Sequence, residues 1–169
     1  TGERGWEKNE LEAVNWFKRA AAQDHPEACA NLGLLYAAGK GVPRSPIEAV
    51  KLYRRSAAKI HPPGEMLLAI AYLKGEGTTR NIQRGYIWLE HAAATGLPEA
   101  RSLFQTVRSQ ATSKLLQEVE RLRNAPVLGP TLVQMPQSSR DGTIGANVTD
   151  SIQSVFTGQV AYALTNMAL

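Results

Sequence analysis

A period of 36 residues constrains this chain more than any other feature of its sequence. The run Glu12-Ala13-Val14 recurs as Glu48-Ala49-Val50, so one shift brings three consecutive residues into register. Applying the shift once or twice superimposes further identical residues: Ala21-Ala22 on Ala57-Ala58 and Ala93-Ala94, His25 on His61, Tyr36 on Tyr72, and Pro26-Glu27-Ala28 on Pro98-Glu99-Ala100. Agreement of this breadth indicates an array of structural repeats.

Apolar residues within one unit are spaced as in an amphipathic helix. Val50, Tyr53, Ala57 and Ile60 follow one another at steps of three and four residues. This spacing places side chains on one face of a helix, so we expect all four on a buried stripe.

The same unit contains a second predicted helix, from about residue 27 to 38. Pro26 suits its first turn, where a proline costs no hydrogen bond, and Leu32, Leu35 and Tyr36 are expected on its inner side. Each repeat is therefore a pair of helices that bury their apolar faces against each other.

Glycines mark the joint between the two helices. Gly39 and Gly41, followed by Pro43, form a typical helix stop, and the pair recurs as Gly75-Glu76-Gly77. Gly5 lies one period before Gly41, so we expect a turn there as well. We also expect the chain to start inside a repeat whose first helix is absent, as a fragment or processed form of a longer array.

A helix pair of this size cannot bury its apolar face alone, so successive pairs must stack. The predicted fold class is therefore all-α: an α/α superhelix, or solenoid, of about three helix-turn-helix repeats, with a capping helix and an extended C-terminal tail. Repeats are predicted over residues 1–110, the capping helix over 111–124, and an extended strap with an uncharged C-terminal segment over 125–169.

The capping helix has one apolar face, formed by Leu115, Leu116, Val119 and Leu122, that we expect to cover the end of the stack. The last segment, 151–169, has no charged residue and spaces its apolar side chains as a possible helix capped by Asp150. It either folds back on the solenoid or forms a partly ordered tail, or it docks onto a partner subunit; the sequence leaves these open. Its apolar positions are Ile152, Val155, Phe156, Ala163, Leu164 and Met167.

Residues that could carry chemistry are better explained by the repeat. Cys29 lies between alanines and is predicted to be a buried, unreactive thiol. His25 and His61 occupy equivalent turns, and His91 has no HExxH partner. We therefore predict no catalytic residue, no cofactor and no metal site.

The charge and hydropathy patterns give weak evidence for other partners. Net charge is +4, and Lys18-Arg19 with Arg54-Arg55 form a small basic ridge, for which a solvated helix face is a better explanation than RNA binding. The aromatic residues Trp16, Tyr53 and Trp88 recur at core spacing and are assigned to packing. No apolar run approaches the ~20 residues of a membrane span, and the compartment stays unknown.

One unit has the motif Ala28-x-x-x-Leu32-Gly33-x-x-Tyr36-x-x-Gly39-x-Gly41-Val42-Pro43, followed by Ala49-x-x-Leu52-Tyr53-Arg54-Arg55-x-Ala57-Ala58. This motif resembles the Sel-one-like repeat family, a relative of the tetratricopeptide repeat, and the resemblance covers roughly residues 5 to 108. In the last unit, Arg108-Ser109-Gln110 replaces the tyrosine and paired glycines expected after Phe104, so the array is expected to end there. The resemblance implies an adaptor or scaffold that binds other proteins.

The resemblance also implies where a partner binds, because the first helix of each pair lines the concave surface in related solenoids. The apolar members of this set are expected to form an exposed patch for an apolar peptide or helix, and Asn31 to bond its backbone. The predicted partner-binding residues are Asn31, Leu34, Leu67, Ile70, Leu103 and Thr106.

Two functional hypotheses remain. In the first, the chain is an adaptor that binds segments of partner proteins on the solenoid. In the second, it is a permanent subunit of a large assembly, anchored by its strap and uncharged C-terminus. RNA binding is a third and weaker hypothesis, which predicts salt-dependent affinity for nucleic acid.

Overall fold

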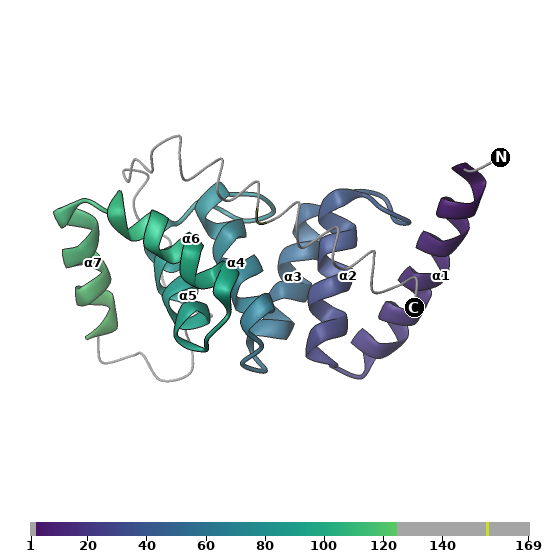
Figure 1. Cartoon of the computed structure of the whole chain (residues 1–169), viewed down its shortest axis with the longest axis horizontal. Coiled ribbons are helices and arrows are strands. Elements are labelled where there is room, and N and C mark those ends of the chain that lie inside the picture. The colour runs from purple at the N-terminus through teal and green to yellow at the C-terminus, as the bar shows by residue number, and fades with distance from the viewer. Residues whose placement is uncertain (1–2, 125–154, 156–169) are drawn as a thin grey trace.

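The computed structural model describes residues 3–124 and Val155, with residues 3–9 described by their backbone alone. The described residues form seven α-helices and no strand, arranged in a row from α1 to α7 (Figure 1). The helices are α1 (Glu3–Ala22), α2 (Pro26–Ala38), α3 (Pro46–Ala57), α4 (Pro62–Lys74), α5 (Ile82–Ala94), α6 (Pro98–Ser109) and α7 (Ser113–Arg123).

Each helix packs against the next along the chain from α1 to α6, and contacts also join α2 to α4 and α5 to α7. This is the nearest-neighbour packing of a solenoid, in which pairs of helices stack into one elongated core. The predicted fold class is confirmed, and the helix predicted over residues 27–38 is α2. The division of the whole chain into repeats, capping helix and strap stays a prediction.

The helices of a pair begin in two different ways. α2, α4 and α6 each start with a proline and have no side-chain cap. α3 also starts with a proline, Pro46, but it and α5 are capped as well, by Ser45 and Asn81, whose side chains accept hydrogen bonds from the amides of Glu48 and Arg84. Both devices suit a helix start, because the first four amides lack partners within the helix.

Glycines bring successive repeats into close contact. Gly39 and Gly75 have positive φ angles of 72° and 75° and end α2 and α4 in the left-handed conformation. Gly77, two residues later, lies so close to α3 that a Cβ there would be 2.0 Å from the carbonyl oxygen of Pro46. Gly41 makes the equivalent approach to the backbone of α1. The second glycine of each turn is therefore required by the contact between repeats.

The turn predicted at Gly5 is wrong, because α1 runs without a break from residue 3 to 22. In the later repeats the equivalent turns follow α2 and α4, and they pack on α1 and α3 respectively. Among the described residues, which begin at residue 3, no helix precedes α1 for such a turn to follow.

The predicted position of Ile60 on a buried stripe is also wrong. Helix α3 ends at Ala57, and Ile60 has a φ of 54° with its side chain 70% exposed. The equivalent residues one period away, Asp24 and Gly96, have positive φ angles of 56° and 95°. Every repeat therefore reverses direction through a left-handed residue here, and the turn overrides the helical spacing that continued to Ile60.

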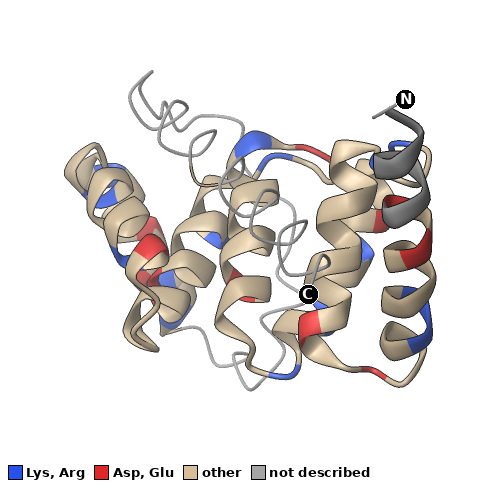
Figure 2. Ribbon diagram, turned by 45° about the vertical axis from the view of Figure 1, so that its right-hand side comes forward, with Lys and Arg blue, Asp and Glu red and all other residues tan. Residues whose placement is uncertain are grey.

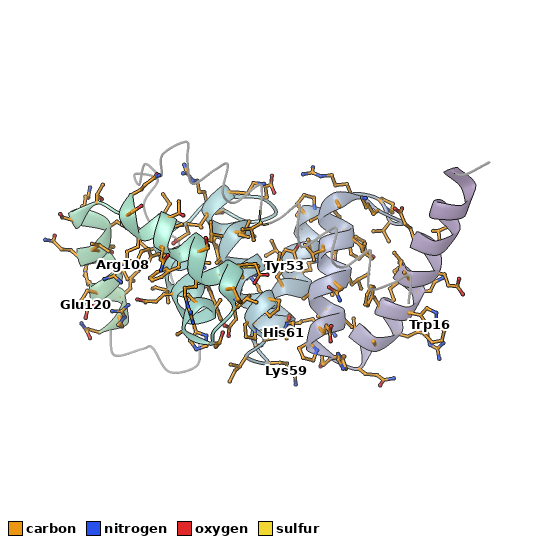
Figure 3. All side chains as sticks on the ribbon, in the orientation of Figure 1. Trp16, Tyr53, Lys59, His61, Arg108 and Glu120 are labelled. Atoms are coloured by element: carbon orange, nitrogen blue, oxygen red, sulfur yellow. The ribbon has the colours of Figure 1, made fainter. Side chains whose placement is uncertain are left out.

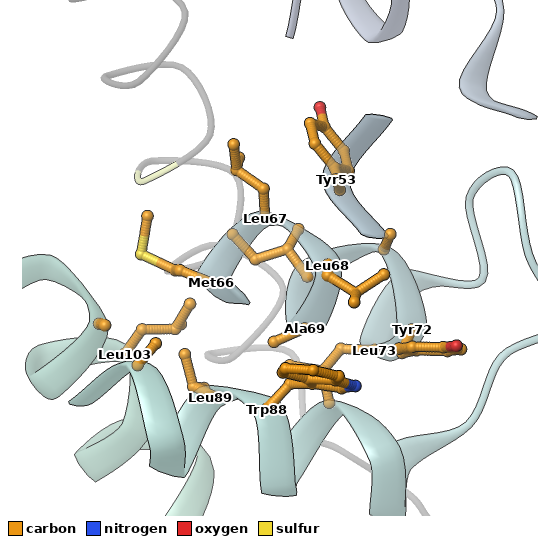
Figure 4. Packing of buried hydrophobic residues seen from close by; sticks show 14 of the residues in the cluster. Tyr53, Met66, Leu67, Leu68, Ala69, Tyr72, Leu73, Trp88, Leu89 and Leu103 are labelled. Carbon is orange, nitrogen blue, oxygen red and sulfur yellow. The ribbon is translucent and has the colours of Figure 1, made fainter. Parts of the chain in front are cut away.

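The core consists of two clusters. The smaller joins α1, α2 and α3, and it includes Cys29, which is buried as predicted; burial raises the pKa of its thiol. The larger extends from α2 to α7 and centres on α4, whose residues from Gly64 to Leu73 are all buried (Figure 4). A mostly apolar helix belongs in such a position, and the one charged residue of this stretch, Glu65, lies 2.8 Å from the Nδ1 of His91.

Helix α7 covers the far end of the core, although with a narrower face than predicted. Leu115 and Val119 are buried, but Leu116 is exposed. The helix also binds α5 through an ion pair of 2.5 Å between Arg123 and Glu90. Val155 packs against the larger cluster, as expected if its segment folds back on the solenoid; the other residues of 151–169 lie outside the described residues.

Trp16 is not in the core, contrary to prediction. Its side chain is 61% exposed on α1, at one end of the row (Figure 3), and the guanidinium of Arg19 lies 4.9 Å from its ring centre. The equivalent residues Leu52 and Trp88 are buried in the clusters that hold the repeats together. Within the described residues no helix precedes α1, so Trp16 has nothing to pack against on that side.

We expect Gly77→Ala to destabilise the protein by about 1–3 kcal/mol more than Gly96→Ala, as measured by urea unfolding. Both residues have positive φ, so both variants carry the cost of a left-handed alanine. Only Gly77 has the backbone of α3 in the path of its Cβ, whereas a Cβ at Gly96 meets no atom within 4 Å. Equal losses of stability would show that the contact between repeats does not require glycine.

Candidate functional site

The structure places most of the predicted partner-binding residues in the core rather than on an open surface. Leu34, Leu67, Ile70 and Leu103 are each 3% exposed or less and belong to the larger cluster. These positions of α2, α4 and α6 pack into the core, so the exposed apolar patch expected there is not observed. Their role in binding a partner stays a prediction.

The two polar members of the set are accessible. Asn31 and Thr106 are partly exposed, on α2 and α6. The hydroxyl of Thr106 donates to the carbonyl of Ser102 in its own helix, at 3.1 Å. Asn31 is thus the member whose side chain is best placed to bond a partner backbone.

A hollow among α2, α3 and α4 brings two of the predicted residues together. It is open to solvent on one side, and its walls are almost entirely apolar. Such a surface suits an aliphatic side chain of a partner. The lining residues are Ala37, Pro46, Ala49, Val50, Tyr53, Leu67, Ile70, Ala71 and Glu76.

Tyr53 lines this hollow and carries a buried polar atom. Its ring is buried against Gly33, where a Cβ would lie 2.5 Å from the ring, while its hydroxyl points away from Leu67 and Leu68 (Figure 4). The hydroxyl oxygen is buried and has no hydrogen-bond partner among the described residues. Burial, with a smaller effect of Glu76, raises the pKa of Tyr53, so the group stays a neutral donor and acceptor.

Sequence reasoning assigned Tyr53 to packing alone. That assignment is correct for its ring but missed the hydroxyl. The available signal was a change within the repeat: Phe17 and Leu89, one period before and after Tyr53, have no hydroxyl. A polar atom on a ring so tightly enclosed is retained at a cost unless something binds it.

The histidine turns serve the repeat, as predicted. The Ser56 hydroxyl donates to the carbonyl of Pro26 at 2.7 Å, so the Nδ1 of His61, 3.0 Å away, must donate to the Ser56 oxygen. This chain of bonds ties α3 to the starts of α2 and α4. Burial is the main cause that lowers the pKa of His61, and His25 adds to the effect.

The basic ridge is largely occupied by contacts within the protein. Arg55 forms an ion pair of 2.6 Å with Asp24 and also donates to the carbonyl of Ala21. The hydrogen bond from Arg55 is the main cause that lowers the pKa of Asp24. Acidic and basic residues are mixed along the ribbon rather than separated by sign (Figure 2). The arrangement does not form the continuous basic stripe that a nucleic acid would follow.

Other kinds of site have no basis in the described part of the chain. No group of three or more His, Cys, Asp or Glu side chains is arranged there to hold a metal ion. None of the described helices combines the length and apolar character that crossing a membrane requires.

The repeat pattern decides the family. The model of the Sel1 repeat matches residues 1–25, 26–61 and 62–97, which is more than half of the chain. The chain belongs to the Sel1 repeat family. One family unit corresponds to α2 with α3, and the next to α4 with α5, so α1 is the second helix of a unit.

Two solved structures show the same architecture. A protective antigen of uropathogenic Escherichia coli with an SLR fold is 32% identical at a TM-score of 0.54, covering 59% of this chain and 22% of the antigen. A Sel1 repeat protein from Oxalobacter formigenes is 34% identical at a TM-score of 0.52, covering 54% of this chain and 69% of that protein. This chain thus spans about a fifth of the length of the antigen. No curated protein matches it.

Sel1 repeat proteins generally act as scaffolds for protein interactions, and they are typically non-catalytic. In a family of this kind, surfaces that accept protein segments are the relevant ones, and the hollow beside Tyr53 is one such surface among the described residues.

Tyr53→Phe is expected to leave the free energy of unfolding unchanged or to raise it by up to about 1 kcal/mol, because it removes a buried hydroxyl that has no partner among the described residues. Tyr53→Ala should lower the free energy by about 3–5 kcal/mol through loss of the ring. Urea unfolding of both variants checks this. A loss above 1 kcal/mol in the phenylalanine variant would mean that the hydroxyl is bonded in the folded protein.

His61 should make the protein less stable in mild acid. Its folded pKa lies below the unfolded value, so the unfolded chain binds more protons as the pH falls from 6.5 toward the folded pKa. The stability that the neutral imidazole contributes is therefore present above pH 6.5 and is lost below it. Urea unfolding between pH 7.5 and 5 should show a steeper loss for the native sequence than for His61→Gln. Parallel pH profiles would contradict this assignment.

Proposed function

We propose that this chain is a non-catalytic scaffold or adaptor that binds segments of partner proteins on its solenoid surface. The observation that carries the proposal is the apolar hollow among α2, α3 and α4, which is lined by Leu67, Ile70 and Tyr53. An apolar side chain of a partner fills the hollow. Membership of the Sel1 repeat family supports a protein ligand.

A second candidate is a permanent subunit of a large assembly, anchored by the C-terminal segment. In its favour, large apolar side chains are exposed at both ends of the described solenoid, with Leu11 and Trp16 on α1 and Leu116 on α7. Residues 151–169 are also uncharged, which suits a buried attachment. In this case the partners are neighbouring subunits held through the ends and tail rather than through the hollow.

Substitution at the rim of the hollow separates these candidates. Ala37 is partly exposed on α2, so Ala37→Arg places a long charged side chain over the apolar walls while leaving the core intact. Ala94→Arg is the matched control, because Ala94 is exposed at the end of α5 and does not line the hollow. We expect Ala37→Arg to capture at least tenfold less partner protein than Ala94→Arg, as measured by affinity capture from the source cells and quantitative mass spectrometry.

The other outcomes assign the function differently. If both arginine variants keep their partners and a chain ending at Asn124 loses them, the C-terminal anchor is the correct candidate. If capture yields RNA whose retention falls steeply with salt, the RNA hypothesis gains support instead. If the native chain captures no protein at all, the scaffold proposal is wrong. Circular dichroism of every variant confirms that it is folded.

A further inference from the structure

Two arginines from different helices converge on one tyrosine. Arg54 of α3 donates through Nη2 to the hydroxyl of Tyr72 at 3.2 Å, and Arg84 of α5 donates through Nη1 to the same oxygen at 3.5 Å. Both guanidinium carbons lie near the ring as well, at 6.0 and 5.6 Å from its centre. Tyr72 belongs to α4, so three helices meet at this point.

Neither arginine forms an ion pair among the described residues. Arg84 is only 7% exposed, and the Nε atoms of Arg54 and Arg84 are both buried without a hydrogen-bond partner in that part of the chain. A buried charge is costly unless a counter-charge and hydrogen bonds compensate it. Among the described residues, these two guanidinium groups share one neutral hydroxyl, which is far from compensating both charges.

Comparison of the units shows that Arg84 reverses the charge found at this position in the earlier units. Arg84 lies one period after Glu48 and two periods after Glu12, so the first two units have an acid at this position. Glutamate here would place a carboxylate beside Arg54. Arg84 is also the third residue of α5, and a helix start is already positive because its amides point outward. The third unit thus concentrates positive charge where an acid is expected.

We propose that Arg54, Tyr72 and Arg84 form a carboxylate-binding site, which is filled by an acidic side chain of a partner protein. Guanidinium groups bind carboxylates through paired hydrogen bonds, and Arg54 is the partly exposed member of the pair, from whose side an anion approaches. The tyrosine oxygen accepts from both arginines, so its own proton remains to be donated to the anion.

A protein segment is the source of the carboxylate, and this part of the inference rests on the proposed scaffold function. The mixed charges along the ribbon argue against a phosphate chain as the ligand, because such a chain needs a series of basic residues rather than one pair (Figure 2). A partner that places an apolar residue in the hollow and an acid between Arg54 and Arg84 would contact α3 at both sites.

Titration of the full chain with glutarate, followed by NMR of the arginine Nε–H groups, tests the site without any partner. The signals of Arg54 and Arg84 should shift and saturate, while that of Arg121, which is exposed on α7, should change only with ionic strength. Shifts of Arg54 and Arg84 no larger than that of Arg121 would overturn the proposal. Tighter binding of inorganic phosphate than of glutarate at equal ionic strength would overturn the choice of a carboxylate.

Arg84→Glu tests the charge reversal directly. Restoring the acid of the first two units should weaken glutarate binding at least tenfold and raise the melting temperature, because the new carboxylate takes the place of the ligand beside Arg54. Arg84→Gln, which removes the charge without adding an acid, should also weaken binding and serves if the first variant does not fold. Glutarate binding unchanged by both variants would show that the site is elsewhere.

The site and the scaffold function fail in different ways. The control Ala94→Arg should leave the glutarate response unchanged, because Ala94 belongs neither to the hollow nor to the arginine pair. Glutarate binding without capture of any protein would support the site and reject the scaffold. Capture of partners equally by the native chain and by Arg84→Glu would reject the acidic side chain of a partner as the ligand.

Discussion

The stacking of each helix pair on the next is the constraint on which the rest of the structure depends. No unit has a core of its own: Leu52 and Trp88 are buried only because neighbouring units cover them, and the equivalent Trp16 is exposed where no described helix does so. Burial in a solenoid is therefore a property of the position in the array as well as of the residue. The apolar side chains that are buried between units in the middle of the array are therefore exposed at the ends of its described part.

Stacking in turn requires that the chain reverse at the same place in every unit. A left-handed residue ends each pair, at Asp24, Ile60 and Gly96. The glycine turns after α2 and α4 then pack against α1 and α3. The left-handed conformation is costly for a β-branched side chain, so Ile60 shows that tertiary packing determines this turn. Backbone geometry thus repeats more faithfully than the residues that adopt it.

Much of the fold could be predicted from the period, because identical spacing in three units reports the helices, the turns and the stacking together. The candidate site could not be predicted to the same extent. Leu67 and Ile70 were assigned to a groove by analogy, yet whether an apolar side chain of α4 meets solvent or core depends on what packs over it. Periodicity gives the face of a helix but not the neighbours of that face, which is why Leu116 and Trp16 were also misplaced.

Departures from the repeat carry different information from the repeat itself. A position that keeps the same residue in each unit is explained by stacking. A position at which the charge of the side chain changes sign is not. Arg84 replaces the acid of two earlier units at a buried position beside another arginine, a change that stacking alone would oppose. The hydroxyl of Tyr53 is likewise more than packing needs. In a scaffold built from near-identical units, such residues distinguish one unit from the next, and they are where specificity for a partner has room to arise.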